Sequence, residues 1–317
     1  MEGAVVSKRK VVKMKKNRCI FKKERDIPIY ALLFPALFLV IIFNYIPMYG
    51  IIIAFKNFSP YKGIMGSEWK GIENFKYFLL DNNFWRVMRN TVVINFYKII
   101  FGFPMPIIFA LSLNELIRVK IKKLIQTLSY LPYFISWVVA AGIFIQILSP
   151  TGGIINLLMN RFLGIEPIYF LTKKEYFVSI VIISSIWKDF GMGSVYYLAT
   201  LSTIDPTLYE AAKIDGAGRW KQTVHITLPG IKYIAIVLFI INIGSMVTIG
   251  FEQIFLLYNP LVYDVGDVIS TYTYRLGIEQ TRFSLTTAIG FTQSIVNFVL
   301  VYSANKISKK VAGWALW

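Results

Sequence analysis

The chain has 317 residues, of which 56% are hydrophobic, and its mean hydropathy of +0.57 is too high for an ordinary soluble domain of this length. Its 34 Lys and Arg outnumber its 17 Asp and Glu, but the basic runs lie beside long apolar segments, which argues against a nucleic-acid-binding face. A single cysteine, Cys19, and a single histidine, His225, exclude an internal disulfide and argue against a metal site.

Six apolar stretches are long enough to cross a membrane, because a hydrocarbon core of ~30 Å needs about 20 helical residues. The first is too long for a signal-peptide core and has no small-residue cleavage site, so we expect it to be retained. The sequence predicts an all-α membrane domain over residues 27–306, between a basic tail over 1–26 and a short tail over 307–317. The six predicted spans cover residues 27–55, 91–114, 124–148, 176–199, 231–255 and 285–306.

The distribution of Lys and Arg predicts how the spans are oriented, since these charges resist translocation. The amino-terminal tail is dense in basic residues over 8–25, and the short connection over 118–123 carries four more. The first external connection also holds basic residues, but its length dilutes them. We therefore expect both termini in the cytoplasm, with the basic tail solvated against anionic membrane lipid rather than bound to a specific ligand.

A polar segment over residues 205–229 lies between the fourth and fifth predicted spans. Asp205 suits a helix N-cap, Pro206 suits the first helical position, and Gly216 and Gly218 suit the helix end. A short helix is therefore expected over 208–213.

The remainder of this segment predicts a second short helix over 219–226. Pro229 would then start a turn into the fifth span. His225 lies in this segment, where we expect a packing or interface residue rather than a general base. The whole segment is predicted to be a compact helix pair on the cytoplasmic face.

This helix pair contains a motif in which particular residues recur at defined spacings. They are Glu210, Ala211, Ala212, Asp215, Gly216, Ile226, Leu228 and Pro229. This pattern resembles the EAA loop of binding-protein-dependent ABC importer permeases. The resemblance implies that the loop is a coupling helix pair that fits a cleft on an ATPase subunit, where Glu210 pairs with a basic residue. The alternative is a merely amphipathic interfacial helix.

The resemblance extends from about residue 27 onward and is closest to the sugar-uptake branch, particularly permeases for complex oligosaccharides. It rests on Leu131–Trp137, Ser149–Asn156 and the form of the loop over Tyr209–Leu228. It implies the six-helix permease (MetI-like) fold of the maltose-type importers and import of a carbohydrate, expected to be an oligosaccharide, across the bacterial cell membrane. A same-fold permease for peptides or amino acids is the alternative, and a membrane-embedded enzyme or sensor is a third reading.

The energy source is expected to be a partner protein. The sequence contains no G-x-x-x-x-G-K-[ST] phosphate loop and no convincing catalytic constellation, so we expect no enzyme activity and no cofactor bound by this chain. The resemblance implies two ATP-hydrolysing subunits, a second permease subunit and an extracytoplasmic solute-binding protein.

Charged residues inside spans cost ~2.5 to 3.5 kcal/mol on insertion scales, so they usually face a cavity or a partner. Lys188 and Asp189 lie midway along the fourth span, where they either line the substrate path or compensate each other or a neighbouring subunit. Aromatic and polar residues that sugars favour complete the pool of candidates. The pool comprises Trp187, Lys188, Asp189, Tyr196, Tyr197, Asn242, Glu252, Gln253, Gln293 and Asn297.

Overall fold

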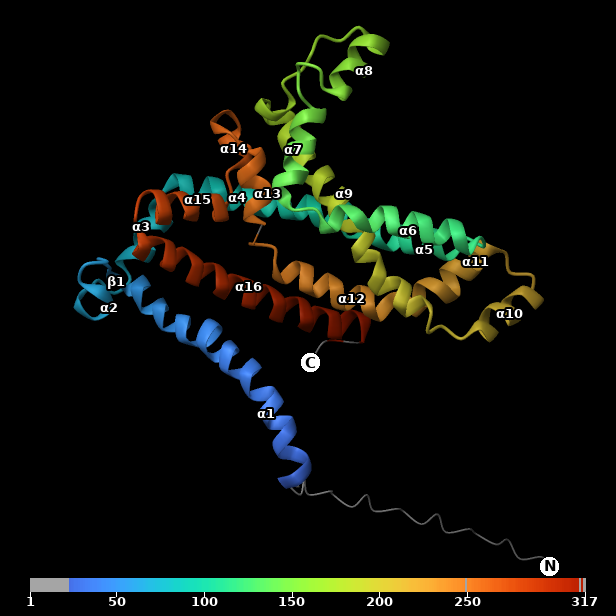
Figure 1. Cartoon of the computed structure of the whole chain (residues 1–317), viewed down its shortest axis with the longest axis horizontal. Coiled ribbons are helices and arrows are strands. Elements are labelled where there is room, and N and C mark those ends of the chain that lie inside the picture. Colours follow the sequence, from blue (N-terminus) through green and yellow to red (C-terminus); the bar gives the residue numbers. More distant parts are fainter. Residues whose placement is uncertain (1–22, 249, 314, 316–317) are drawn as a thin grey trace, which may run out of the picture. The chain divides into compact units, whose positions relative to one another are not determined.

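The computed structural model describes residues 23–248, 250–313 and 315, and most of them are helical (Figure 1). The chain divides into two compact units, over residues 1–51 and 52–317. Most of the predicted basic tail over 1–26 lies outside the described residues. In the first unit, α1 (Lys23–Val40) leads through a π-helical turn, η1 (Ile41–Tyr45), into η2 (Ile46–Phe55), which enters the second unit.

The second unit begins with a small hairpin. The order is β1 (Lys56–Asn57), α2 (Gly63–Gly66), β2 (Glu68–Trp69), α3 (Glu73–Leu80), α4 (Asn82–Tyr97), η3 (Lys98–Gly102), α5 (Pro104–Asn114), α6 (Val119–Phe134), α7 (Trp137–Ile147), α8 (Ile154–Leu163), η4 (Phe170–Thr172) and α9 (Lys174–Leu201). It continues with α10 (Pro206–Ile214), α11 (Arg219–Gln222), η5 (Thr223–Thr227), α12 (Leu228–Gly244), α13 (Phe251–Leu257), η6 (Pro260–Val262), α14 (Tyr263–Gly266), α15 (Ile269–Tyr274), η7 (Arg275–Glu279) and α16 (Phe283–Ala312). β1 and β2 pair antiparallel, with Lys56 opposite Trp69.

Five helices of the described chain are long and apolar enough to cross a membrane. They cover residues 30–55, 82–114, 174–201, 219–244 and 283–310. The predicted third span over 124–148 is not one straight helix, because α6 and α7 meet at a bend of 103°. Figure 1 shows α7 turning away from α6. Pro132 lies in the last turn of α6, and Ser136 caps α7 by accepting the Val139 N–H, so both helices end locally at the bend.

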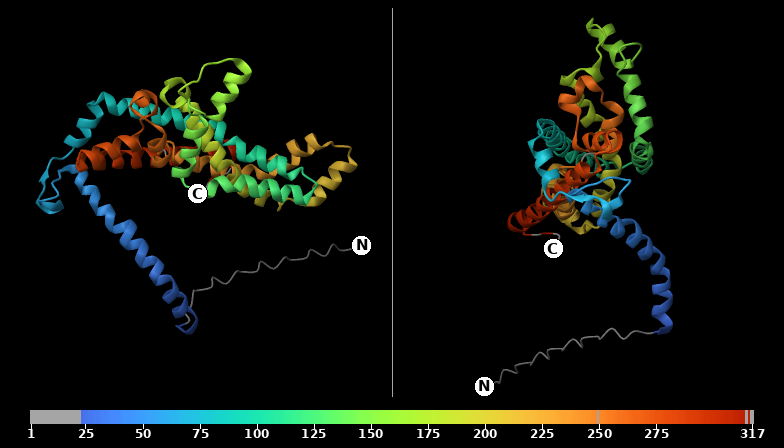
Figure 2. Two further views of the ribbon diagram at one scale, coloured as in Figure 1. Left: turned by 45° about the horizontal axis from the view of Figure 1, so that its top comes forward. Right: turned by 90° about the vertical axis from the view of Figure 1, so that its left-hand side faces the viewer.

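The fifth predicted span, over 231–255, is wrong at both ends. Its helix is continuous over 219–244, so the turn predicted at Pro229 does not occur. The π-helical turn η5 directly precedes α12, whose second residue is Pro229, and shifts the hydrogen-bond pattern there. The helix ends at Gly244, and a Cβ there would lie 2.3 Å from Val301, which shows how closely α12 packs on α16. Figure 2 shows this orange and red pair from two further sides.

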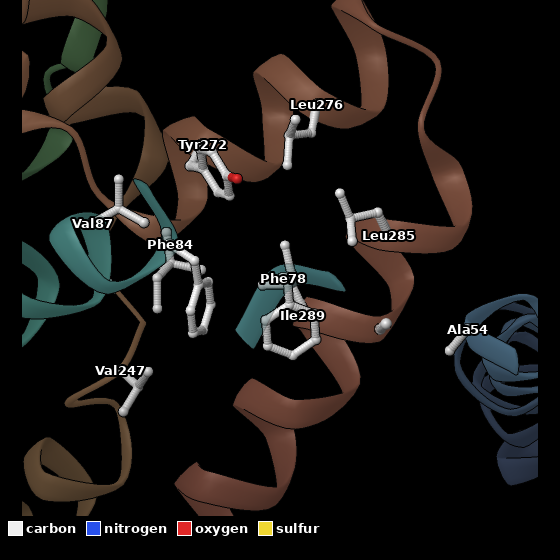
Figure 3. Packing of buried hydrophobic residues seen from close by; sticks show 11 residues of the cluster. Ala54, Phe78, Phe84, Val87, Val247, Tyr272, Leu276, Leu285 and Ile289 are labelled. Atoms are coloured by element: carbon white, nitrogen blue, oxygen red, sulfur yellow. The ribbon is translucent and has the colours of Figure 1, made fainter. Parts of the chain in front are cut away.

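A buried apolar cluster joins the ends of the helices that flank the 56–81 and 257–282 connections. Phe78 of α3 and Phe84 of α4 pack with ring centroids 4.7 Å apart, against Ile289 of α16 (Figure 3). Tyr272 of α15 completes the contact. The cluster fixes this end of the bundle, and two further clusters lie along α9.

Candidate functional site

The cytoplasmic helix pair predicted over residues 205–229, which we call the coupling loop, begins with the expected N-terminal cap. Asp205 accepts a hydrogen bond from the Thr207 backbone N–H at 2.9 Å, and Pro206 occupies the first turn of α10. The same hydrogen bond lowers the pKa of the Asp205 carboxyl below its ordinary value. The start of α10 is therefore encoded by two adjacent residues.

The end of α10 is a glycine-dependent reversal. Gly216 has φ +75°, a left-handed conformation that L side chains rarely adopt. The Ala217 N–H donates to the Ala212 carbonyl at 2.8 Å, and the Gly216 N–H donates to the Lys213 carbonyl at 3.1 Å. These two bonds form a Schellman motif, which satisfies the last carbonyls of the helix and sets the direction of the following chain.

Side-chain bonds fix the two halves of the coupling loop against each other. The Tyr209 and Thr227 hydroxyls lie 3.1 Å apart, and Gln222 donates from Nε2 to the Ala217 carbonyl at 2.7 Å. The helix pair is thus a braced hairpin rather than a slack connection.

The coupling loop presents a largely exposed surface. Ala212 and Ile226 are half-buried, whereas the other motif residues are exposed. The exposed motif residues are Glu210, Ala211, Asp215, Gly216, Leu228 and Pro229. Ile214 at the end of α10 and Trp220 in α11 are 87% and 78% exposed, so both helices of the coupling loop carry a large exposed apolar side chain. An exposed apolar surface of this kind is typical of a protein-protein contact.

A cavity of ≈ 280 Å³ lies among α4, η3, α5, α9 and α12 inside the second unit. Polar and aromatic groups share its wall with aliphatic side chains. Four predicted path residues line it: Asp189, Tyr196, Tyr197 and Asn242. Four polar residues that the prediction omitted also line it: Asn95, Lys98, Ser185 and Ser245. Lys98 was visible in the sequence as a charge inside a predicted span.

The Lys98 ammonium is held at the cavity wall by a buried amide. Its Nζ donates to Gln253 Oε1 at 2.7 Å. The Gln253 Nε2 donates in turn to the Val181 carbonyl at 2.7 Å and to Ser184 Oγ at 2.9 Å. Gln253 is only 1% exposed and does not line the cavity, so it acts on the cavity by positioning Lys98.

Lys188 and Asp189 have different environments although they are neighbours. The Lys188 Nζ donates to the carbonyls of Pro132 (3.2 Å), Tyr133 (2.9 Å) and Ile135, at the bend between α6 and α7. Its ammonium also lies 5.7 Å from the Tyr133 ring centroid. The carbonyls, rather than Asp189, therefore satisfy Lys188, whereas Asp189 faces the cavity.

The other predicted path residues lie away from this cavity. Trp187 packs edge-on against Phe144. Gln293 donates to the Val247 carbonyl, and Asn297 donates to Thr248 Oγ1 at 2.9 Å, so both brace the break after α12. Glu252 is exposed and is not among the lining residues. Among the described residues, no group of three His, Cys, Asp or Glu could hold a metal ion.

Comparison with known proteins places this geometry in a family. A family model described as binding-protein-dependent transport system inner membrane component matches residues 102–313. Protein LplB of Bacillus subtilis strain 168 is 43% identical over 287 residues, which are 90% of each chain. The polygalacturonan/rhamnogalacturonan transport system permease protein YteP of the same strain is 40% identical over 298 residues, covering 94% of this chain and 92% of that one.

A solved structure agrees with these relatives. The crystal structure of a bacterial alginate ABC transporter in complex with an alginate pentasaccharide-bound periplasmic protein contains a chain with a TM-score of 0.84 and 40% identity. The similarity covers 92% of this chain and 98% of that chain. The expected permease fold is thereby confirmed. The chain belongs to the binding-protein-dependent transport system inner membrane component family, and it is a permease subunit of an ATP-binding-cassette importer rather than an enzyme.

Proposed function

We propose that this permease carries an oligosaccharide across the bacterial cell membrane through the cavity that Asp189 lines. The observation that carries the proposal is the cavity wall, where two tyrosines lie among amide, hydroxyl and charged groups contributed by three spans, over 82–114, 174–201 and 219–244, and by Ser245 directly after the last of them. Sugar rings bind to aromatic faces and to convergent hydrogen-bonding groups. The names of YteP, for a polysaccharide, and of the alginate transporter, for a pentasaccharide-bound partner, support the same substrate class.

The coupling loop is proposed to dock on an ATP-hydrolysing subunit through Glu210. Support comes from its braced backbone, from the exposure of Glu210, and from the exposed apolar side chains of Ile214 on the same helix and of Trp220 on α11. A second permease subunit would complete the path, and an extracytoplasmic solute-binding protein would deliver the sugar. Movement of the docked helices would then switch the cavity between inward and outward access.

The orientation is proposed to place both termini in the cytoplasm. The basic runs over 8–25 and 118–123 support it. Counting the bent pair α6 and α7 as one span gives six spans, so the coupling loop falls on the same side as both termini. The connections over 56–81, 148–173 and 245–282 then lie outside.

Transport by the assembled importer tests the substrate class. The permease would be reconstituted in proteoliposomes with its ATPase, its second permease subunit and its solute-binding protein, and supplied with labelled oligosaccharides or peptides. We expect ATP-dependent accumulation of an oligosaccharide. Accumulation of peptides or amino acids in its place would overturn the proposal.

Cysteine labelling tests the orientation. In a Cys19→Ser background, single cysteines would replace Tyr61, which is fully exposed, and Lys310 in the last turn of α16. A maleimide that cannot cross membranes should label position 61 in intact cells and position 310 only after permeabilisation. The reverse pattern would contradict the six-span orientation.

A further inference from the structure

Two further cavities lie at the end of the bundle that the proposed topology places outside. Their volumes are ≈ 450 Å³ and ≈ 510 Å³, and both are lined by Tyr77, Gln280 and Arg282. We call this pair the outer groove. It shares no lining residue with the cavity of ≈ 280 Å³ that Asp189 lines, which we call the mid-bundle cavity. Each volume falls within the range of ~300 to 1,000 Å³ that is typical of small-molecule sites.

The outer groove and the mid-bundle cavity lie along one continuous helix. Arg86 of α4 lines the groove, and Lys98 at the start of η3 lines the cavity. Twelve residues at ~1.5 Å each separate them by about 18 Å along the helix axis. A substrate that enters from outside would therefore meet the groove first.

Arg275 is fixed in the groove by a buried carboxylate. Its Nη2 donates to Asp267 Oδ2 at 2.6 Å, and Asp267 is 0% exposed. The guanidinium also lies 5.0 Å from the Tyr263 ring centroid and 5.8 Å from that of Tyr272. Although burial of Arg275 opposes its charge, the hydrogen bond that it donates to the Asp267 carboxylate raises its pKa, so the group is a permanent cation.

Arg282 is placed in the groove by an unusual backbone conformation. Thr281 has φ +56°, and no other described residue apart from glycine has a positive φ. The Arg282 backbone N–H donates to the Leu276 carbonyl at 2.9 Å, and its Nη1 lies 3.4 Å from the Tyr77 hydroxyl. Such strain persists only where the surrounding structure holds it, and it is concentrated at functional sites.

The carboxylates of the groove already have partners. Asp81 accepts from the Tyr272 hydroxyl at 2.6 Å, and Glu73 lies 3.9 Å from Lys70. Three arginines line the two cavities: Arg86, Arg275 and Arg282. Arg86 lies 3.5 Å from Asp264, and Asp264 also pairs with Lys174. Arg275 and Arg86 are thus held by Asp267 and Asp264, whereas the ion pairs of the described residues include none for Arg282, which leaves the Arg282 guanidinium beside the Tyr77 hydroxyl to bind an anionic ligand.

This combination matches one class of sugar. Guanidinium groups bind carboxylates through paired charge-assisted hydrogen bonds, and tyrosine rings contact the apolar faces of pyranose rings. We propose that the outer groove binds the uronate carboxylates of an acidic oligosaccharide before it reaches the mid-bundle cavity. The inference rests on the proposed function, because it names the substrate class of an oligosaccharide importer, and on the proposed orientation.

A binding experiment isolates the groove from the solute-binding protein. The assembled transporter, in nanodiscs without that protein, would be titrated by saturation-transfer NMR with a uronate trisaccharide and with its carboxyl-reduced counterpart. We expect the uronate to bind at least about tenfold more tightly than its reduced counterpart, which is the typical contribution of one hydrogen bond to a charged group. Arg282→Gln should remove this preference and Arg282→Lys should restore part of it. Lys62→Gln, which removes an exposed charge in the 56–81 connection that does not line the groove, should leave it unchanged.

Equal binding of the two trisaccharides, or an unchanged preference in Arg282→Gln, would overturn the inference. Uptake by proteoliposomes with the solute-binding protein keeps the two proposals apart. Transport of neutral oligosaccharides without any groove preference would leave the proposed function intact and remove this one, whereas absence of any oligosaccharide uptake would remove the proposed function. If Arg282→Gln weakened attachment of the solute-binding protein and left the NMR preference unchanged, the groove would be a docking surface and the inference would be wrong.

Discussion

The coupling loop and the mid-bundle cavity are held together in different ways. The loop is fixed by short-range backbone features, namely the Asp205 cap and the left-handed Gly216. The cavity depends on contacts between residues far apart in the chain, such as the hydrogen bond that holds the lining residue Lys98 to Gln253, 155 residues away. The difference implies that single backbone changes should disable the loop, whereas changes at the cavity should act through the neighbours of each side chain.

The largest loss of transport activity is expected when proline replaces Gly216, where the chain of the coupling loop reverses direction. Gly216→Pro demands a φ near −65° where the chain has +75° and removes an N–H that donates to Lys213, at a cost of about 3 kcal/mol or more. We expect loss of uptake and of substrate-stimulated ATP hydrolysis in proteoliposomes. Gly218→Pro is the matched control, because Gly218 already has φ −69°. Equal losses in both variants would show that the Gly216 conformation is not the cause.

A slightly smaller loss of uptake and of substrate-stimulated ATP hydrolysis is expected when the charge of Glu210 is reversed. Glu210→Lys would place like charges together at the proposed ATPase cleft, and loss of a hydrogen-bonded interfacial charge pair typically costs about 2 to 5 kcal/mol. Co-purification of the ATPase and stimulated hydrolysis should fall at least about tenfold, while membrane abundance stays the same because Glu210 is exposed. Normal attachment and uptake would refute the coupling role.

Lys188→Met should reduce stability more than any exposed charge substitution. The change removes the donor that satisfies three carbonyls at the α6–α7 bend, and each unsatisfied buried group costs about 1 to 3 kcal/mol. The Tm of the detergent-solubilised protein should fall. Lys188→Arg keeps the charge and should lose less. An unchanged Tm in Lys188→Met would mean that the bend does not depend on this ammonium.

The smallest effect on stability is expected at the neighbouring residue. Asp189→Asn keeps the shape of a cavity-lining side chain and removes its charge beside Lys98, so the Tm should change by less than that of Lys188→Met. Uptake should nevertheless fall by about threefold to tenfold, which corresponds to roughly one charge-assisted hydrogen bond. If Asp189→Asn lowered Tm and left uptake unchanged, the contrast between the two residues would be reversed.

Local signals in the sequence predicted the coupling loop and most of the helices. Asp205, Pro206 and Gly216 act on the backbone within one helical turn, so their effect does not depend on distant parts of the chain. Apolar length likewise predicted where spans occur. The motif at Glu210 predicted the family, because its residues and spacing are contained in one segment.

Only the tertiary structure decided which polar side chains face the mid-bundle cavity. Successive residues of a helix point about 100° apart, so the side chains of Lys188 and Asp189 lie in different environments. Hydropathy does not reveal which of the two faces a neighbouring helix. The structure directs Lys188 to the carbonyls of Pro132 and Tyr133 and leaves Asp189 in the cavity. The bend at those carbonyls was also invisible to a count of apolar residues, since composition alone does not distinguish one straight span from two helices that meet at 103°.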